Sequence, residues 1–244
     1  MDPKKRIEII QNWISNYVNK MPKKAQSLVV GVSGGIDSAV VSTISAMTGL
    51  KTIVLSMPIK QIEDQDDLSK LHCNWLQKNF KNTEYLNINL DETFSKFEDA
   101  LGKNDNEHAF ANSRARLRMT TLYQVAGSNH GIVVGTGNKV EDFGVGFYTK
   151  YGDGGVDISP IADCTKTQVW EMGRYLKIDQ KIIDAPPTDG LWVDGRNDED
   201  QLGMTYQELE EAMENPQSKN YEKYLKIREN NLHKIKEIPV CKFN

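Results

Sequence analysis

The residues best suited to chemistry lie at Ser33–Ser38, where the chain reads Ser-Gly-Gly-Ile-Asp-Ser. The apolar run at 28–32 predicts a short buried strand, and the apolar residues after Ser38 predict a helix. A strand, a glycine turn and a helix N-terminus form an anion site, because backbone N–H groups converge there and the helix dipole favours negative charge. A carboxylate beside phosphates repels them unless a cation lies between, so Asp37 predicts a divalent metal, with Mg²⁺ the best candidate.

The loop differs from two common phosphate-binding motifs. It lacks the lysine of a Walker A loop, and it lacks the Gly-x-Gly-x-x-Gly spacing of a dinucleotide fingerprint. The order Ser-Gly-Gly-Ile-Asp-Ser resembles instead the signature of the ATP pyrophosphatases, which cleave ATP to AMP and pyrophosphate. The alternative is an ordinary glycine turn between a strand and a helix.

Charged residues further along the chain are candidate partners for such a ligand. Arg114, Arg116 and Arg118 share one predicted helix without acidic residues four positions away, which suggests phosphate or carboxylate recognition or, alternatively, a solvated basic face. Glu141 follows a predicted strand and is a second candidate metal carboxylate, although a glutamate in a loop is usually just solvated. Lys166 falls in the first turn of a predicted helix, where the dipole disfavours a cation unless an anionic ligand is held there.

Two irregular segments are candidate ligand-binding loops. Residues 146–160 contain four glycines, which cost chain entropy and indicate a close approach of backbone to ligand. Residues 185–200 form a long acidic segment rich in proline and glycine. Irregular segments of that length are either functional lids or mobile surface loops, and the sequence favours neither.

Strands and helices alternate along the 244 residues. Predicted strands at 28–32, 52–57, 85–90 and 131–135 are separated by helical patterns, and this order is typical of parallel βαβ units. We therefore expect one α/β domain over residues 1–244, a doubly wound, mostly parallel sheet flanked by helices. Ligands of such sheets bind beyond the carboxyl ends of the strands, where both Ser33–Ser38 and Glu141 fall.

Composition excludes several classes of protein. The net charge of −4 argues against a general nucleic-acid binder. Three widely spaced cysteines suggest neither a disulfide framework nor a zinc site, and no apolar run is typical of a signal peptide or a membrane span, so a cytoplasmic protein is expected. His72 and His108 lie far from other obvious ligands and are interpreted as structural or solvated.

Longer motifs extend the resemblance to one family, the ammonia-dependent NAD synthetases. These motifs are Gly-Phe-Tyr-Thr-Lys-Tyr-Gly-Asp-Gly-Gly-Val-Asp at 146–157, residues 112–119, Pro-Thr-Asp-Gly at 187–190, Asp-Glu-Asp-Gln-Leu-Gly at 198–203 and His233-Lys234. The resemblance implies the final step of NAD biosynthesis, in which deamido-NAD is amidated with ATP through an acyl-adenylate. Glutamine-using members carry an additional N-terminal amidohydrolase domain, and no glutaminase domain is expected here, so ammonia is the expected nitrogen donor.

The resemblance also implies roles for individual residues. Positions that match ATP-binding ones are Gly31, Val32, Ser33, Gly34, Gly35, Ile36, Asp37, Ser38, Thr136, Lys166 and Thr188. Positions that match deamido-NAD-binding ones are Arg116, Lys150, Asp157, His233 and Lys234. Asp37 and Glu141 would hold Mg²⁺, and Asp37, Lys166 and Asp153 are the catalytic candidates, with Asp153 a hypothetical ammonium site.

The sequence departs from the family pattern at one place. The turn after the fourth predicted strand is one residue longer before Gly146, so Asp142 is an alternative to Glu141 as the metal ligand. Family members are homodimers, and we expect the same here. The alternatives are an ATP pyrophosphatase that amidates a different acid, for instance a nucleotide synthetase, and a nucleotide-binding regulatory module without turnover.

Overall fold

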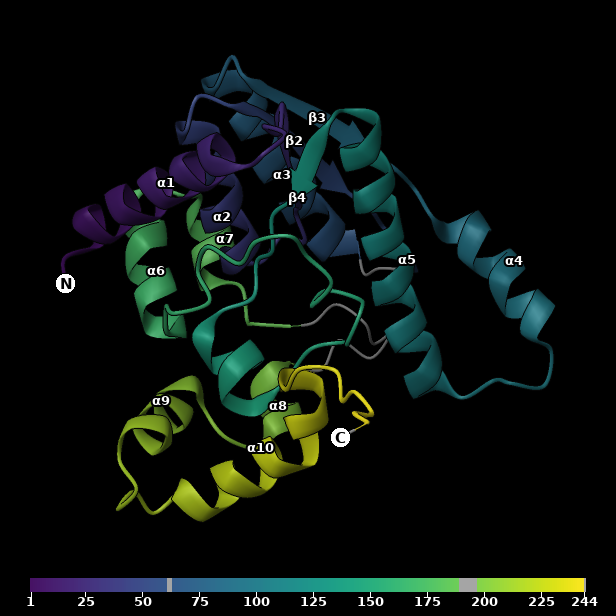
Figure 1. The fold of residues 1–244 in the computed structure, drawn as a ribbon, viewed down its shortest axis with the longest axis vertical. Coiled ribbons are helices and arrows are strands. Elements are labelled where there is room, and N and C mark those ends of the chain that lie inside the picture. Colours follow the sequence, from purple (N-terminus) through teal and green to yellow (C-terminus); the bar gives the residue numbers. More distant parts are fainter. Residues whose placement is uncertain (61–62, 189–196, 244) are drawn as a thin grey trace.

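A computed structural model describes residues 1–60, 63–188 and 197–243. Its helices and strands follow one another as α1 (Pro3–Lys20), β1 (Ser27–Gly31), α2 (Ile36–Met47), β2 (Lys51–Ser56), α3 (Glu63–Asn79), β3 (Thr83–Asn87), α4 (Asp91–Leu101), α5 (Glu107–Ser128), β4 (Gly131–Val133), the π-helix η1 (Lys139–Val145), α6 (Lys166–Tyr175), α7 (Gln180–Asp184), α8 (Asp198–Leu202), α9 (Tyr206–Glu214) and α10 (Tyr221–Ile235). Figure 1 shows their arrangement.

The four strands form one parallel sheet in the order β3-β2-β1-β4, which confirms the predicted fold class. Val29 of β1 pairs with Ile53 of β2 on one side and with Val133 of β4 on the other. The strand order therefore reverses between β1 and β4. In open α/β sheets this reversal opens a crevice at the carboxyl ends of the strands.

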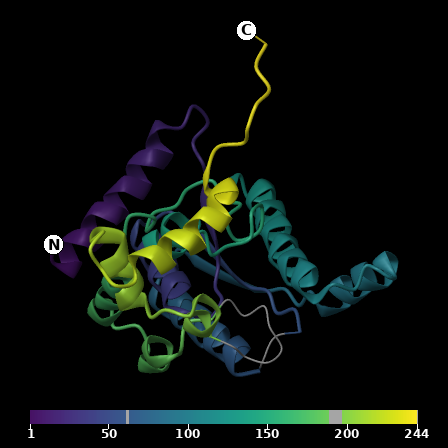
Figure 2. The ribbon, with the colours of Figure 1, turned by 90° about the horizontal axis from the view of Figure 1, so that it is seen from below.

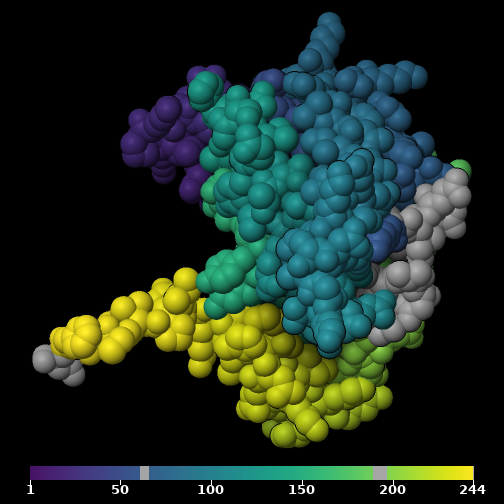
Figure 3. Space-filling view, turned by 90° about the vertical axis from the view of Figure 1, so that its right-hand side faces the viewer, coloured from purple at the N-terminus to yellow at the C-terminus, as the bar shows by residue number. Residues whose placement is uncertain are grey.

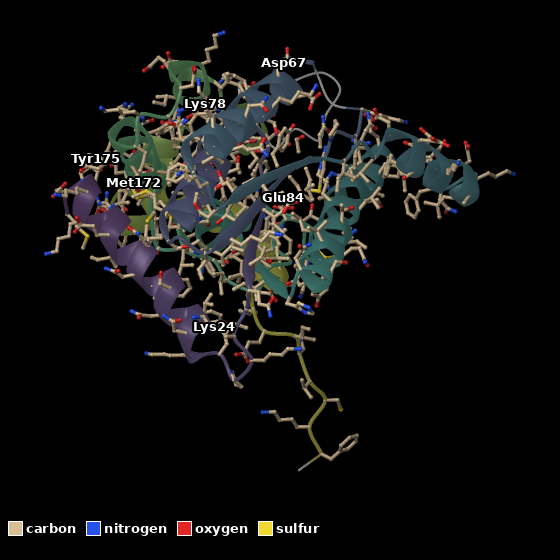
Figure 4. All side chains as sticks on the ribbon, turned by 90° about the horizontal axis from the view of Figure 1, so that it is seen from above. Lys24, Asp67, Lys78, Glu84, Met172 and Tyr175 are labelled. Atoms are coloured by element: carbon tan, nitrogen blue, oxygen red, sulfur yellow. The ribbon has the colours of Figure 1, made fainter. Side chains whose placement is uncertain are left out.

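Both faces of the sheet are covered by helices, as its buried side chains require. Leu28 and Val30 of β1 pack on one face with residues of α1, α2, α6 and α7. Val29, between them, points to the opposite face and packs with residues of α4 and α5. This alternation is the period of two expected for a strand with two buried faces. Met172 of α6 is buried, and Figure 4 shows Met172 and Tyr175 beside α1.

A third layer lies beyond the carboxyl ends of the strands. Residues of η1, α8, α9 and α10 share a separate apolar cluster, which includes Val140, Leu202, Tyr206 and Leu209. In Figure 3 the part of the chain from α8 to α10, coloured yellow-green to yellow, lies beneath the teal part. The residues after α10 extend away from the body (Figure 2). Among the described residues, no helix has both the length and the apolar character needed to cross a membrane.

Some strand boundaries differ from prediction. The predicted strand 131–135 ends at Val133, because the chain then turns and Val134 forms a single parallel bridge with Ile158. The predicted strand 85–90 begins earlier and ends earlier, at Thr83–Asn87. The helix predicted over 107–127 is present as Glu107–Ser128. Part of the segment 185–200, for which a lid and a surface loop are the alternatives, lies outside the described residues, at 189–196.

Candidate active site

A cavity of about 1130 Å³ lies at the crevice between β1 and β4. Its lining includes the whole segment 31–38, the end of β2, one side of α5, η1, part of the loop 147–156, residues 185–188 and the end of α10. The segments predicted from sequence to do chemistry thus meet around one space, although they are up to about 200 residues apart in the chain.

The loop Ser33–Ser38 presents an open helix N-terminus to this cavity. Gly34 has φ of 92°, a conformation that glycine adopts without strain, and Gly35 is the N-cap of α2 without a side-chain cap. The Ser38 hydroxyl donates to the Gly35 carbonyl at 2.9 Å and accepts from the Ser33 backbone N–H at 3.2 Å. The loop is thereby fixed by its own side chains while the helix end stays available for an anion.

Asp37, Glu141 and Lys166 form a buried charge cluster beside this loop. The Lys166 ammonium lies 2.5 Å from Asp37 Oδ2 and 2.9 Å from Glu141 Oε1. Burial alone would lower the pKa of Lys166, but the two facing carboxylates raise it above its usual value, so Lys166 is a permanent cation. Lys166 thus bridges the two carboxylates that the sequence suggested as metal ligands.

The two carboxylates have different surroundings. Burial and the neighbouring Glu141 raise the pKa of Asp37, although Lys166 opposes this. Burial also acts to raise the pKa of Glu141, but Lys166 and the hydroxyl of Tyr206 lower it below its usual value. Glu141 is therefore the carboxylate whose charge the protein stabilises more strongly.

Local structure explains how these three side chains meet. Lys166 begins α6 directly after Thr165, whose hydroxyl and the Gln168 side chain form a capping box. Asn138 follows β4, caps η1 by accepting from the Val140 and Glu141 N–H groups, and donates to Asp37 Oδ1 at 3.1 Å. One buried asparagine thus sets the positions of both carboxylates.

The turn after β4, predicted to be one residue longer than in the family pattern, contains a π-helix over Lys139–Val145. A π-helix accommodates an additional residue within a helical turn, and such turns are frequent at functional sites. Glu141 faces Lys166, whereas Asp142 lies on the cavity wall near Asp153 and Lys234. Burial, and then Glu141 and Asp153, raise the pKa of Asp142 well above its usual value.

A further part of the cavity wall, which we call the basic wall, carries basic side chains that contact backbone carbonyls. Arg116 Nε donates to the Lys150 carbonyl at 3.3 Å, and Lys150 Nζ donates to the His233 carbonyl at 3.0 Å. Lys234 Nζ donates to the Tyr148 carbonyl at 2.9 Å. Asp153, which also lines the cavity, accepts from the Thr149 N–H at 3.0 Å.

Asp157 and Arg114 lie outside this lining. Asp157 accepts from the Val133 N–H at 2.7 Å and from the Tyr123 hydroxyl at 3.1 Å, so it ties the chain back to β4. Arg114 is buried over the ring of Phe94 at 5.6 Å. Thr136, Thr188, Ile36, Arg116 and Arg118 do line the cavity.

The glycines of residues 146–160 have a packing role that the sequence did not indicate. A Cβ at Gly152 would lie 2.9 Å from Ala115 Cβ, and a Cβ at Gly154 would lie 2.4 Å from the ring of Tyr148. These glycines let the loop pack on α5 and on itself. Packing therefore accounts for Gly152 and Gly154, and Gly152 and Gly155 also line the cavity, so the predicted approach of this loop to a ligand stays a prediction.

Sequence reasoning missed two residues of the cluster, Asn138 and Tyr206. Tyr206 is fully buried, and its hydroxyl lies 2.5 Å from Glu141 Oε1. Asn138 carried a weak signal, since asparagine is a common N-cap, but no helix was expected at that point. Tyr206 lies 65 positions from Glu141 and belongs to none of the sequence motifs described above.

The parallel sheet, its reversal of strand order and the Ser-Gly-Gly-Ile-Asp-Ser loop define the class, an ATP pyrophosphatase-type fold. A family model described as NAD synthase matches residues 6–242, and the chain therefore belongs to the NAD synthase family, whose members are ligases that use ATP as co-substrate.

Individual relatives agree with this membership. An NH(3)-dependent NAD(+) synthetase of Carboxydothermus hydrogenoformans is 41% identical over 84% of this chain and 83% of its own length. A solved NMN synthetase from Francisella tularensis is 33% identical, with a TM-score of 0.91 and full coverage of both chains. A solved NH3-dependent NAD synthetase from Campylobacter jejuni is 25% identical, with a TM-score of 0.79, covering 99% of this chain and 100% of that one.

Proposed function

We propose that this chain amidates deamido-NAD with ATP and ammonia, giving NAD, AMP and pyrophosphate. The observation that carries the proposal is that the cluster of Asp37, Glu141 and Lys166 lies beside the open N-terminus of α2 and shares one cavity with the basic wall. Such a cavity has one end for phosphates and another for an acid substrate. Membership of the NAD synthase family supports the choice of reaction.

The chemistry requires an activated acid, because a carboxylate has no adequate leaving group for attack by ammonia. The substrate carboxylate oxygen forms a bond to the α-phosphorus of ATP, and the bond to pyrophosphate breaks. Ammonia then forms a bond to the acyl carbon and loses a proton, and AMP leaves with the former carboxylate oxygen. The protein contributes mainly orientation and charge stabilisation.

We assign the phosphate end to segment 31–38 together with Thr136, Lys166 and Thr188, all of which line the cavity. The backbone of Ser33–Ser38 would bind pyrophosphate oxygens at the helix N-terminus. We assign the basic wall to the acid substrate, through Arg116, Lys150, His233 and Lys234, which all line the cavity. Asp157 lies outside the lining, so in this proposal it could reach a substrate only in a second copy of the chain.

The residues present fit a Mg²⁺ ion. Asp37 and Glu141 offer buried carboxylate oxygens, which Mg²⁺ prefers, and they already share one cation, Lys166. The described residues contain no group of three or more His, Cys, Asp or Glu side chains able to hold a metal, so phosphates and water would complete the coordination. A bound Mg²⁺ would neutralise charge on the phosphates.

These assignments require Lys166 to change partners. In the free protein its ammonium is bound to both carboxylates, at 2.5 and 2.9 Å. If Asp37 and Glu141 held Mg²⁺, repulsion between the two cations and attraction to the phosphates would favour Lys166 binding to the nucleotide. Lys166 would then leave the carboxylates as the metal was bound, an exchange of one cation for another.

We assign ammonium capture to Asp153. Its carboxylate lines the cavity near Asp142 and Lys234, and a carboxylate at the cavity wall attracts a small cation such as ammonium. The proton lost from nitrogen would pass to Asp153. If Asp153→Asn retained its apparent ammonia affinity and its rate at every pH, this assignment would be wrong.

A second candidate substrate is the mononucleotide acid, nicotinate mononucleotide. The observation that favours it is the TM-score of 0.91 to an NMN synthetase over the full length of both chains, against 0.79 to an NH3-dependent NAD synthetase. The curated relatives, at up to 41% identity, favour the dinucleotide. The phosphate end is compatible with either acid, so the two candidates differ only at the basic wall.

One assay tests the proposal. Purified protein is incubated with ATP, Mg²⁺, ammonium and either deamido-NAD or nicotinate mononucleotide, and AMP and the amide product are quantified. We expect a higher kcat/KM with deamido-NAD. A higher value with the mononucleotide would establish the second candidate, and the absence of AMP with both would favour a regulatory module. Activity with glutamine in place of ammonium would contradict the nitrogen donor.

We further propose a cytoplasmic homodimer formed from one catalytic domain per chain. Ile9, Trp13 and Tyr17 are each 40 to 47% exposed and lie four residues apart on one face of α1. Such an apolar helix face is suited to contact with a second copy. Light scattering of the wild type and of Trp13→Glu tests this, and an unchanged mass would contradict a role for this face.

A further inference from the structure

Tyr206 is the first residue of α9 and contacts residues of two other elements of the site, η1 and α8. Its hydroxyl lies 2.5 Å from Glu141 Oε1 and 3.1 Å from Asp198 Oδ2. Its backbone N–H donates to Glu199 Oε1 at 3.0 Å. The side chain is fully buried and is not among the described residues that line the cavity, so it acts on the site only through other residues.

The ring of Tyr206 is held by apolar neighbours independently of Lys166, whose Nζ lies 4.8 Å from the ring centroid in the free protein. The ring of Trp170 packs edge-on with a centroid distance of 5.9 Å. Leu209 and Val140 belong to the same buried cluster. Because the ring is already ordered, directing its hydroxyl at Glu141 costs little additional conformational entropy.

Glu141 Oε1 therefore accepts from two donors, Lys166 Nζ and the Tyr206 hydroxyl. The exchange proposed above removes the first donor when the nucleotide and metal arrive. The second donor is neutral and does not compete with a metal for charge. It can keep the carboxylate in its orientation throughout the exchange.

We propose that Tyr206 is a positioning residue for the metal site, which holds Glu141 in a metal-binding orientation once Lys166 has moved to the nucleotide. The inference rests on the proposed function, because it takes Glu141 as a metal ligand. Hydrogen bonds to ligating carboxylates orient the ligand, and their loss typically weakens metal binding by about 10- to 100-fold.

The Tyr206 hydroxyl also lies close to α8, because Asp198 belongs to that helix. Asn197, Asp198 and Gln201 line the cavity. The Tyr206 hydroxyl donates its single proton to the nearer oxygen, that of Glu141, and Asp198 Oδ2 lies 3.1 Å from the same hydroxyl, while the backbone N–H donates to Glu199. Tyr206 thus fixes the position of η1 relative to α8, and residues of both elements line the cavity. A phenylalanine at this position keeps the ring and removes both side-chain contacts.

The test compares wild type, Tyr206→Phe and Tyr224→Phe. Tyr224 is a suitable control because it is buried in the same apolar cluster without lining the cavity. Binding of Mn²⁺ or Mg²⁺ is measured by calorimetry in the presence of α,β-methylene ATP, in which the bond to be cleaved is blocked. We expect the metal affinity of Tyr206→Phe to fall by about 10- to 100-fold, while that of Tyr224→Phe is unchanged.

Two further readouts separate positioning from general destabilisation. At saturating metal, the KM values of Tyr206→Phe for the acid and for ammonium should equal those of wild type. In a Glu141→Gln background, Tyr206→Phe should have no additional effect on metal binding. Equal metal affinities of wild type and Tyr206→Phe would overturn the inference, whereas a wild type that binds neither metal nor analogue would overturn the proposed function instead.

Discussion

The two ends of the cavity are built differently. At the phosphate end the charged side chains bind one another, with Lys166 held between Asp37 and Glu141 and only 3% exposed. At the acid end the basic side chains bind backbone carbonyls, as Lys150 does at His233 and Lys234 does at Tyr148. The first arrangement is buried and mutually compensated, and the second leaves its positive charge available to a substrate.

This difference suggests that the two ends of the cavity have different roles in the reaction. Breaking a bond at the α-phosphorus is common to every acid substrate, so a rigid phosphate end serves all of them. The acid end has to distinguish a mononucleotide from a dinucleotide, and carbonyl contacts are weaker than ion pairs and are exchanged more easily. Changes at the phosphate end should therefore reduce the rate, whereas changes at the acid end should alter substrate preference.

The largest effect is expected for Lys166→Met. Loss of a cation directed at the phosphates should lower kcat by about 10²- to 10³-fold, measured as AMP formation. The same variant leaves Asp37 and Glu141 without their shared counter-ion, so Mg²⁺ without ATP should raise its melting temperature more than that of wild type.

Lys139→Met is the matched control for this prediction. Lys139 pairs with Asp163, which is almost fully exposed, and surface pairs of this kind contribute little. Its rate and its response to Mg²⁺ should match wild type. If Mg²⁺ stabilised Lys166→Met no more than wild type, exchange of cations at this site would be refuted.

A second expected effect is on the pH dependence of stability, through contacts of α2, the helix that presents the phosphate loop. His72 is buried against α2, with Nε2 3.1 Å from the Ala39 carbonyl and 3.1 Å from the Ser42 hydroxyl. Burial lowers the pKa of His72 to about 4, from 6.5. The unfolded chain therefore takes up a proton between pH 6.5 and 4 that the folded chain does not.

The contribution of His72 to the free energy of unfolding should consequently be fully present above pH 6.5. It should be lost as the pH falls to 4, and the loss should be at most about 3 kcal/mol. Urea unfolding between pH 4 and 7.5 measures the slope. His72→Gln should flatten it whatever its absolute stability, and an unchanged slope would show that His72 is not the group responsible.

Sequence reasoning identified the parts of the phosphate end whose chemistry is local. A valine-rich strand, a glycine turn and Asp37 are adjacent in the chain, so the anion site followed directly from them, as did the position of Glu141 after a strand. The parallel sheet followed from the alternation of strands and helices. The unexpected place of Lys166 in a helix N-terminus was also a useful signal, although its partners are carboxylates in the free protein.

What the sequence could not provide depends on tertiary contacts. Tyr206 reaches Glu141 from another layer of the fold, and no spacing rule relates them. The π-helix that contains Glu141 was visible only as a turn one residue too long. The packing of Gly152 and Gly154 against Ala115 and Tyr148 is a second role, which becomes apparent only in three dimensions.

At the acid end we expect a smaller effect, on affinity. Lys150→Met removes a positive charge from the cavity wall and should raise KM for the acid substrate by about 10-fold, with little change in kcat. Measuring kcat/KM for both deamido-NAD and nicotinate mononucleotide sharpens the comparison. A loss confined to one acid identifies Lys150 as a determinant of preference, whereas a fall in kcat alone would contradict the division between the two ends.

The smallest effect is expected for Asp157→Ala, a position implied by resemblance but located outside the cavity. Its carboxylate accepts from the Val133 N–H at 2.7 Å, so its removal should lower stability by about 1–3 kcal/mol. KM for the acid should stay within about twofold of wild type, since Asp157 contacts β4 and Tyr123 rather than the cavity. A rise in KM like that of Lys150→Met would mean that Asp157 reaches a substrate. In this fold that requires the cavity of a second subunit, so the acid end would be completed by two chains while the phosphate end belongs to one.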